Sequence, residues 1–168
     1  EEAIDHDIAL TVFTRDVIKK LEQTAMKKKK RARIHLKIET GMNRIGLQST
    51  AEVMDVTKEI NPEYIELEGA FTHFADADHI DTAYTKKQFA RFQAILNEAE
   101  KKGVSIPIKH CCNSAGTIQY PEMHLDMVRV GISLYGLYPS EHLRENITLY
   151  QAMSFKSKPV LVKTVDAG

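Results

Sequence analysis

Short stretches with apolar residues at alternate positions recur along the chain, separated by longer stretches with helical spacing. From Ile34 to Ile38 the apolar residues face one side and His35 and Lys37 face the other, which is the period of a β-strand. Other short apolar stretches lie at Ile8–Phe13, Leu67–Phe74, Ile106–Asn113 and Asp126–Ile132. The pattern therefore predicts five strands.

Helical patterns fill the intervals between these strands. Thr14 and Ser49 are typical N-cap residues, and Ser49 begins a capping box with Glu52. The clearest helix runs from Tyr84 to Lys102, and Gly103 is its stop signal. Alternating strands and helices with short loops are typical of right-handed βαβ units in a parallel sheet.

The number of units indicates a partial barrel. A TIM-like (β/α)8 barrel has eight strands, so about three are missing from the front. We assign residues 1–138 to the C-terminal part of the barrel and 139–150 to a linker. Residues 151–168 are assigned to the start of a C-terminal β-domain, because Pro159–Val165 has the character of another strand. The expected fold class is α/β, in a piece of a longer protein.

Composition narrows the classes of partner. Lysine plus arginine and aspartate plus glutamate both number 23, so no net charge favours nucleic acid or an anionic membrane. No stretch reaches the roughly 18 apolar residues of a spanning helix. The basic run Lys27–Arg31 is read as a solvated helix end rather than a nucleic-acid patch. Adjacent Cys111 and Cys112 have no metal-ligand spacing, so we expect packing thiols in a cytoplasmic protein without a metal.

Charged side chains gather where the second predicted strand ends. Lys37 and Glu39 lie at that end, and Gly41 and Gly46 frame a loop that carries Arg44. Buried charges are costly unless they are paired, so their convergence indicates a functional site. The alternative is that all three charges are solvated in the loop.

Polar residues also follow the later strands, where barrel enzymes build their sites. Ser114 lies at a predicted helix start, and Gly131-Ile132 offers backbone N–H groups, a combination typical of phosphate binding. The alternative for Ser114 is a plain N-cap. His73 lies near the end of the third predicted strand, and its alternative is a hydrogen-bonded core histidine.

Four segments resemble those of the alanine racemase family, in the family's order and approximate spacing. They are Lys-Ile-Glu-Thr-Gly-Met-Asn-Arg-Ile-Gly at 37–46, Gly-Ala-Phe-Thr-His-Phe-Ala-Asp-Ala-Asp at 69–78, His-Cys-Cys-Asn-Ser-Ala at 110–115, and Asp-Met-Val-Arg-Val-Gly-Ile-Ser-Leu-Tyr-Gly-Leu-Tyr-Pro-Ser at 126–140. The resemblance implies a pyridoxal-phosphate (PLP) enzyme that interconverts L- and D-alanine and supplies D-alanine for peptidoglycan. It further implies a cytoplasmic homodimer.

The resemblance also implies a role for each matched residue. Arg129 would bond the pyridine nitrogen of PLP, and His73 would stack beside the ring. Arg44 would meet the ring's phenolic oxygen and the substrate carboxylate, Met42 would line the substrate site through its backbone, and Lys37 matches a lysine carbamylated in some members. Ser114, Gly131 and Ile132 would hold the phosphate of the cofactor, and Asn113 is a further cofactor-binding residue.

Arg129 lies between Val128 and Val130, so it faces inward if the valines face helices. A guanidinium is always charged and has only donors. Directed at a pyridine nitrogen, it would keep that nitrogen unprotonated and weaken the ring as an electron sink, which suits a racemase. The alternative is a salt bridge to Asp126 or Glu122.

Two family features are absent from the sequence. The Lys-Ala-x-Ala-Tyr-Gly-His-Gly motif with the cofactor-binding lysine is not present, and the catalytic tyrosine belongs to the family's C-terminal domain. We therefore expect the isolated segment to be inactive. The alternatives are a non-enzymatic PLP-binding barrel, a racemase that prefers serine, and an unrelated phosphate-binding barrel.

Overall fold

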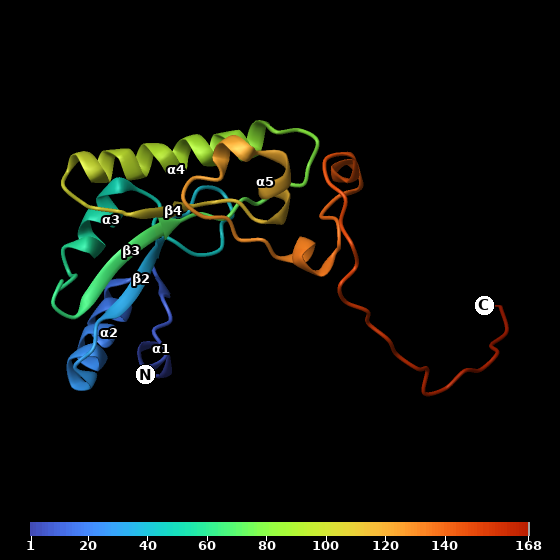
Figure 1. Ribbon diagram of the computed structural model, residues 1–168, viewed down its shortest axis with the longest axis horizontal. Coiled ribbons are helices and arrows are strands. Elements are labelled where there is room, and N and C mark those ends of the chain that lie inside the picture. Colours follow the sequence, from blue (N-terminus) through green and yellow to red (C-terminus); the bar gives the residue numbers. More distant parts are fainter. Residues whose placement is uncertain (168) are drawn as a thin grey trace.

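The sheet in the computed structural model, which describes residues 1–167, has four parallel strands in sequential order (Figure 1). They are β1 (Leu10–Val12), β2 (Ala32–Lys37), β3 (Ile65–Phe71) and β4 (Ile108–His110). The helices are α1 (Glu2–Asp5), α2 (Arg15–Lys28), α3 (Thr50–Thr57), α4 (Ala83–Lys101) and α5 (Ser114–Gln119). Because α2, α3 and α4 each connect successive parallel strands, the predicted βαβ topology is confirmed.

The helix starts follow the predicted capping residues, with one exception. Thr14 accepts the Val17 N–H at 3.4 Å at the start of α2, and Ser49 accepts the Glu52 N–H at 3.2 Å at the start of α3. At α5 the cap is Asn113, whose side chain accepts the Gly116 N–H at 2.9 Å. The reading of Ser114 as a plain N-cap is therefore wrong, and its hydroxyl is available for another contact.

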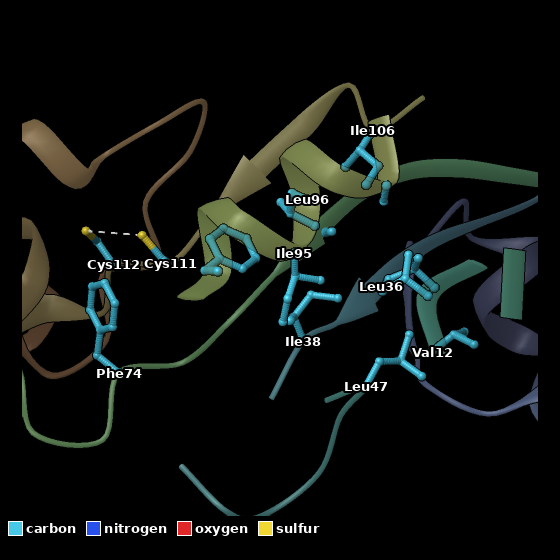
Figure 2. Close-up of a cluster of buried hydrophobic side chains, with 14 of the residues drawn as sticks. Val12, Leu36, Ile38, Leu47, Phe74, Ile95, Leu96, Ile106, Cys111 and Cys112 are labelled. Carbon is cyan, nitrogen blue, oxygen red and sulfur yellow. Dashed lines mark hydrogen bonds between the residues drawn. The ribbon is translucent and has the colours of Figure 1, made fainter. Parts of the chain in front are cut away.

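One face of the sheet packs into the hydrophobic core. Ile34, Leu36 and Ile38 are fully buried there, as the alternating pattern predicts. Figure 2 shows Leu36 and Ile38 in the same cluster as Leu96 from α4. The opposite face carries His35 and Lys37, so the sheet separates an apolar layer from a buried polar one.

Cys111 and Cys112 are free thiols inside this core, as predicted for packing residues (Figure 2). Their sulfur atoms lie 4.0 Å apart. Both thiols also lie within hydrogen-bond distance of the Met123 carbonyl, at 3.1 and 3.3 Å. They anchor the chain between β4 and α5 against the short 3₁₀ helix Pro121–Met123.

Gly69 allows β3 to approach both of its neighbours. A Cβ at this position would collide with the Ile108 carbonyl of β4 and lie 2.8 Å from Cε1 of His35. The pairing of β2 with β3 shifts register between Ile34 and His35, leaving Glu68 without a partner in the ladder. This irregularity accompanies a contact between Glu68 and the His35 ring at the polar face.

The structure corrects the prediction of a strand at Asp126–Ile132. Met127 makes a single parallel bridge to His110, and the Arg129 N–H donates to the Cys112 carbonyl at 2.9 Å. The segment therefore lies beside β4, in the place a fifth strand would take, but has too few ladder hydrogen bonds to be one. A 3₁₀ helix, Ile132–Tyr135, follows directly.

The C-terminal segment differs from its expected strand. Residues 146–167 contain neither helix nor strand, and Val160 and Leu161 are exposed because nothing pairs with Pro159–Val165. The expected linker contains a 3₁₀ helix, Glu141–Glu145, whose Leu143 is buried in the core. The start of a β-domain at residue 151 stays a prediction. Among the described residues, no helix is both long and apolar enough to cross a bilayer.

Candidate functional site

Six predicted site residues line one cavity at the carboxyl ends of β3 and β4. The cavity has a volume of about 330 Å³, and its lining comprises His73, Asp78, Asn113, Ser114, Ala115, Arg129, Gly131, Ile132 and Pro139. These residues come from loops that are distant in sequence, so the parallel topology gathers them as expected for a barrel. Arg44 lines instead a separate cavity of about 400 Å³, and Met42 lines neither of the two.

Arg129 is held by three acceptors. Its Nη1 donates to Nδ1 of His110 at 2.6 Å, and its Nη2 donates to the carbonyl oxygens of Thr72 at 2.9 Å and Cys111 at 3.3 Å. The guanidinium also lies 5.0 Å from the centre of the Phe71 ring. Burial lowers the pKa of Arg129 from its usual value, although a guanidinium remains protonated.

The alternative salt bridge of Arg129 to Asp126 or Glu122 is wrong. A carboxylate oxygen of Asp126 accepts the Lys109 N–H at 2.8 Å, and no ion pair to Arg129 occurs within residues 1–167. The guanidinium is therefore fixed by neutral acceptors and keeps its charge uncompensated at the cavity wall. Such an environment attracts an acceptor from a ligand.

Behind Arg129 lies a chain of two histidines and a carboxylate that sequence reasoning missed. Nε2 of His110 lies 2.8 Å from Nδ1 of His35, and Nε2 of His35 lies 3.1 Å from Oε2 of Glu68. The Glu68 carboxylate also accepts hydrogen bonds from Nε and Nη2 of Arg33, at 3.3 and 2.8 Å. The strand period placed His35 on the polar face with Lys37, a signal that could have identified it.

The direction of this hydrogen-bond chain follows from its donors. Because Arg129 can only donate, Nδ1 of His110 must accept, and its Nε2 carries the proton that is donated to His35. His35 then donates from Nε2 to Glu68. Burial, together with the charge of Arg129, lowers the pKa of His110 to about 3, so its ring is neutral.

Lys37 is buried at the same polar face. Its Nζ donates to the Ile38 carbonyl at 2.7 Å and lies 5.7 Å from the centre of the Phe71 ring. Burial, together with the charges of Arg129 and Arg44, lowers the pKa of Lys37 to about 8, although the Glu39 carboxylate opposes this shift. The reading of solvated loop charges is therefore wrong for Lys37, which is 2% exposed.

Glu39 organises the loop that carries Arg44. Its buried carboxylate accepts the Gly41 N–H and, at 3.4 Å, the Arg44 N–H. Burial raises the pKa of Glu39, but the N–H groups of Asn43 and Gly41 and the charge of Lys37 lower it by more, so the carboxyl ionises more readily than usual. Arg44 itself is exposed, which agrees with the alternative reading of a solvated loop charge for this residue.

Ser114 ties together the two segments expected to hold a phosphate. Its Oγ is buried and accepts the N–H groups of Gly131 at 2.8 Å and Ser133 at 3.3 Å. The Oγ of Ser133 is also buried and has no hydrogen-bond partner within residues 1–167. Two hydroxyl groups with an unused proton therefore lie at this end of the site.

His73 is half-buried with its ring in the cavity lining. Burial lowers the pKa of His73, and the charges of Arg129, Arg44 and Lys37 lower it further, so the ring is neutral at neutral pH. No hydrogen bond to the ring occurs in the described part of the chain, whereas the His73 carbonyl accepts from Gln88 at 3.2 Å. The reading of a hydrogen-bonded core histidine is therefore wrong.

Comparisons with known proteins agree on one family. The family described as "Alanine racemase, N-terminal domain" matches residues 1–139. Alanine racemase 1 of Oceanobacillus iheyensis is 55% identical over 165 residues, which cover 98% of this chain and 44% of that protein. The alanine racemase of Methanococcus maripaludis is 46% identical over 164 residues, covering 96% of this chain and 44% of its own length.

Solved structures give the same result. The alanine racemase of Clostridium difficile 630 has a TM-score of 0.83 and 38% identity, covering 90% of this chain and 42% of that chain. That of Bacillus anthracis, whose structure holds L-Ala-P, has a TM-score of 0.82 and 32% identity, covering 90% and 40%. The chain thus spans less than half the length of the relatives it matches. It belongs to the alanine racemase family, within the family's N-terminal domain.

Proposed function

We propose that the full-length protein that contains this chain is a PLP-dependent alanine racemase, which interconverts L- and D-alanine and supplies D-alanine for peptidoglycan. The observation that carries the proposal is Arg129, whose half-buried guanidinium has no ion-pair partner within residues 1–167 and lies in the wall of the cavity with His73. A pyridine ring nitrogen could accept a further hydrogen bond from this guanidinium. The family membership of the chain supports the same activity.

The residues at the cavity fit the phosphate end of PLP. Ser114 accepts two backbone N–H groups and so keeps its own hydroxyl proton for a ligand, and the buried Ser133 hydroxyl has no hydrogen-bond partner within residues 1–167. Asn113, Gly131 and Ile132 line the same end of the cavity. Its volume of about 330 Å³ lies within the range typical of small-molecule sites.

When bound, PLP supplies an electron sink that acidifies the α-hydrogen of the amino acid. Arg129 would hold the ring nitrogen as a hydrogen-bond donor. Because a guanidinium does not release its proton, the ring nitrogen would stay unprotonated and the sink would remain weak. Arg129 would thereby favour return of the proton to the α-carbon, and so racemisation, over loss of the amino group. The neutral His73 ring would pack beside the cofactor.

The substrate side is assigned to the loop after β2. Arg44 would bind the substrate carboxylate and the phenolic oxygen of the ring, and Met42 would line the substrate site through its backbone. The ionised Glu39 carboxylate supports this assignment because it fixes the backbone of the loop at Gly41 and Arg44. The cofactor-binding lysine and the tyrosine base would be supplied from outside residues 1–168.

The test uses purified full-length protein with PLP. We expect D-alanine to form from L-alanine, at a higher kcat/KM than D-serine forms from L-serine. PLP binding without racemisation of either amino acid would support a non-enzymatic PLP-binding barrel and overturn the proposal. A preference for serine would overturn the substrate assignment alone. Gel filtration and cell fractionation of the same protein test the further proposals of a homodimer and a cytoplasmic location.

A further inference from the structure

Three polar side chains on α4 reach the backbone of two loops at the site. Tyr84 donates from its hydroxyl to the Gly41 carbonyl at 2.8 Å, and Thr85 donates to the Asp76 carbonyl at 3.3 Å. Gln88, one turn further along the helix, contacts both loops and is 1% exposed. These residues lie outside the lining of the main cavity. Helix α4 is therefore hydrogen-bonded to the loops after β2 and β3 through side chains that lie outside the cavity lining.

The hydrogen bonds of Gln88 fix the orientation of its side-chain amide. Its Oε1 accepts the Ala75 N–H at 2.9 Å, and its Nε2 donates to the His73 carbonyl and to Oγ1 of Thr40, each at 3.2 Å. The first two bonds bracket His73, one at its own carbonyl and one two residues later. A carboxylate of the same shape could accept from Ala75 but could not donate to the His73 carbonyl.

The third hydrogen bond extends the connection to the other loop. Oγ1 of Thr40 lies 2.7 Å from Oγ1 of Thr72, and both residues are buried. Thr40 directly precedes the loop that carries Arg44, and Thr72 directly precedes His73. One buried amide is thus bonded to the segments that carry His73 and Arg44, the residues assigned to the cofactor ring and the substrate carboxylate.

We propose that Gln88 is a positioning residue, which sets the place of His73 relative to the Arg44 loop without touching substrate or cofactor. The inference rests on the proposed function, because it concerns the geometry of that site. Misplacement of reacting groups by about 1 Å can cost 100-fold in rate. Loss of the two Nε2 hydrogen bonds should therefore lower kcat by about 10- to 100-fold.

The experiment compares variants of the full-length protein. Gln88→Glu keeps the side-chain shape and the acceptor for Ala75 but removes both donors. Phe92→Leu is the matched control, because Phe92 lies one turn further along α4, is fully buried and belongs to the hydrophobic core. We expect Gln88→Glu to lower kcat for alanine with a smaller change in KM and a shifted visible absorbance of bound PLP. Phe92→Leu should lower the melting temperature at unchanged kcat.

A second pair of variants covers the case in which Gln88→Glu does not fold. Thr40→Val removes one acceptor of the Gln88 amide, whereas Thr40→Ser keeps it. We expect the valine variant to lose kcat and the serine variant to retain it.

The outcomes separate the two proposals. If the wild-type protein racemises no amino acid, the proposed function fails. If the wild type is active and both Gln88→Glu and Thr40→Val keep its kcat, the positioning role fails. It also fails if Gln88→Glu and Phe92→Leu lose kcat in equal proportion to their loss of melting temperature, since that result indicates a merely structural role.

Discussion

Nη1 of Arg129 donates to Nδ1 of His110 at 2.6 Å, across 19 positions of sequence. Since the guanidinium offers only protons, this contact selects the tautomer of His110 and, through it, that of His35. The resulting chain ends on Glu68, whose charge is matched by Arg33. The orientation of the residue assigned to the cofactor's ring nitrogen thus depends on groups on β2, β3 and β4.

Removal of the His110 ring should loosen Arg129. In His110→Leu, Nη1 of Arg129 and Nδ1 of His35 lose their partner. A hydrogen bond to a charged group contributes about 1.5–3 kcal/mol, so we expect PLP to bind about 10- to 100-fold more weakly to the full-length protein. Fluorescence titration with PLP measures this change. His124→Leu is the control because, among the described residues, the His124 ring bonds the Thr117 carbonyl alone, and neither residue lines the cavity. This variant should bind PLP as the wild type does.

Substitution of Gly69 should destabilise the sheet. In Gly69→Ala the new methyl group meets the Ile108 carbonyl and the His35 ring, and overpacking of this kind typically costs about 1–3 kcal/mol. We expect a corresponding fall in the free energy of unfolding in urea. Gly103→Asn is the control, because that position is open and Asn tolerates its positive φ. Equal stability of Gly69→Ala and the wild type would refute the packing described here.

Lys37 should be carbamylated in the full-length protein. A pKa of about 8 leaves roughly a tenth of the amine neutral at pH 7, and the neutral amine adds CO₂, forming an N–C bond and releasing one proton. Formation should therefore rise with pH through about 8, because deprotonation supplies the reactive amine. The product reverses the charge beside Arg129 and could accept a hydrogen bond from Arg44, which relieves the repulsion among these cations.

Two measurements check this modification. ¹³C-labelled bicarbonate should give a carbamate NMR signal that is absent from Lys37→Met. High-resolution electron density should show the added carboxylate near Arg44. A bare amine at Lys37, with no anion near Arg44, would contradict the prediction.

Residues 1–168 alone should not racemise any amino acid. Racemisation requires a base on each face of the α-carbon, and neither the family's lysine motif nor its tyrosine is matched in the sequence. His73, Arg44 and Arg129 would orient and polarise the cofactor without replacing those bases. The test mixes the purified chain with PLP and L-alanine. Formation of D-alanine at an enzymatic rate, abolished by changing one lysine of the chain, would contradict the prediction, because it would show that residues 1–168 contain the catalytic lysine.

Local patterns predicted most of the fold. The alternation through Ile34, Leu36 and Ile38 identified a strand and its buried face, and Ser49 identified a helix start, because both signals act within a few residues. The same reasoning failed at Asp126–Ile132, whose apolar alternation is that of a strand but which makes only a single bridge, to β4. Strand formation depends on a neighbour that the local sequence does not specify.

The sequence predicted which residues form the site better than it predicted the contacts between them. Arg129 and Ser114 line the expected cavity, but the only protein partner considered for Arg129, as the alternative reading, was an acidic residue nearby in the chain. The partner is His110, which β4 places beside it. His35 and Glu68 were missed for the same reason, since periodicity gives the side on which a residue lies and not which distant residue meets it there.

The assignment of Arg129 to the ring nitrogen is the central claim, and Arg129→Glu in the full-length protein tests it most directly. A carboxyl group would let the ring nitrogen carry a proton, which strengthens the electron sink and opposes return of the proton to the α-carbon. Loss of one preorganised charged donor typically costs about 100-fold or more in rate. We predict that Arg129→Glu binds PLP with altered visible absorbance and racemises alanine at least about 100-fold more slowly than the wild type. Racemisation by Arg129→Glu at the wild-type rate would contradict the account.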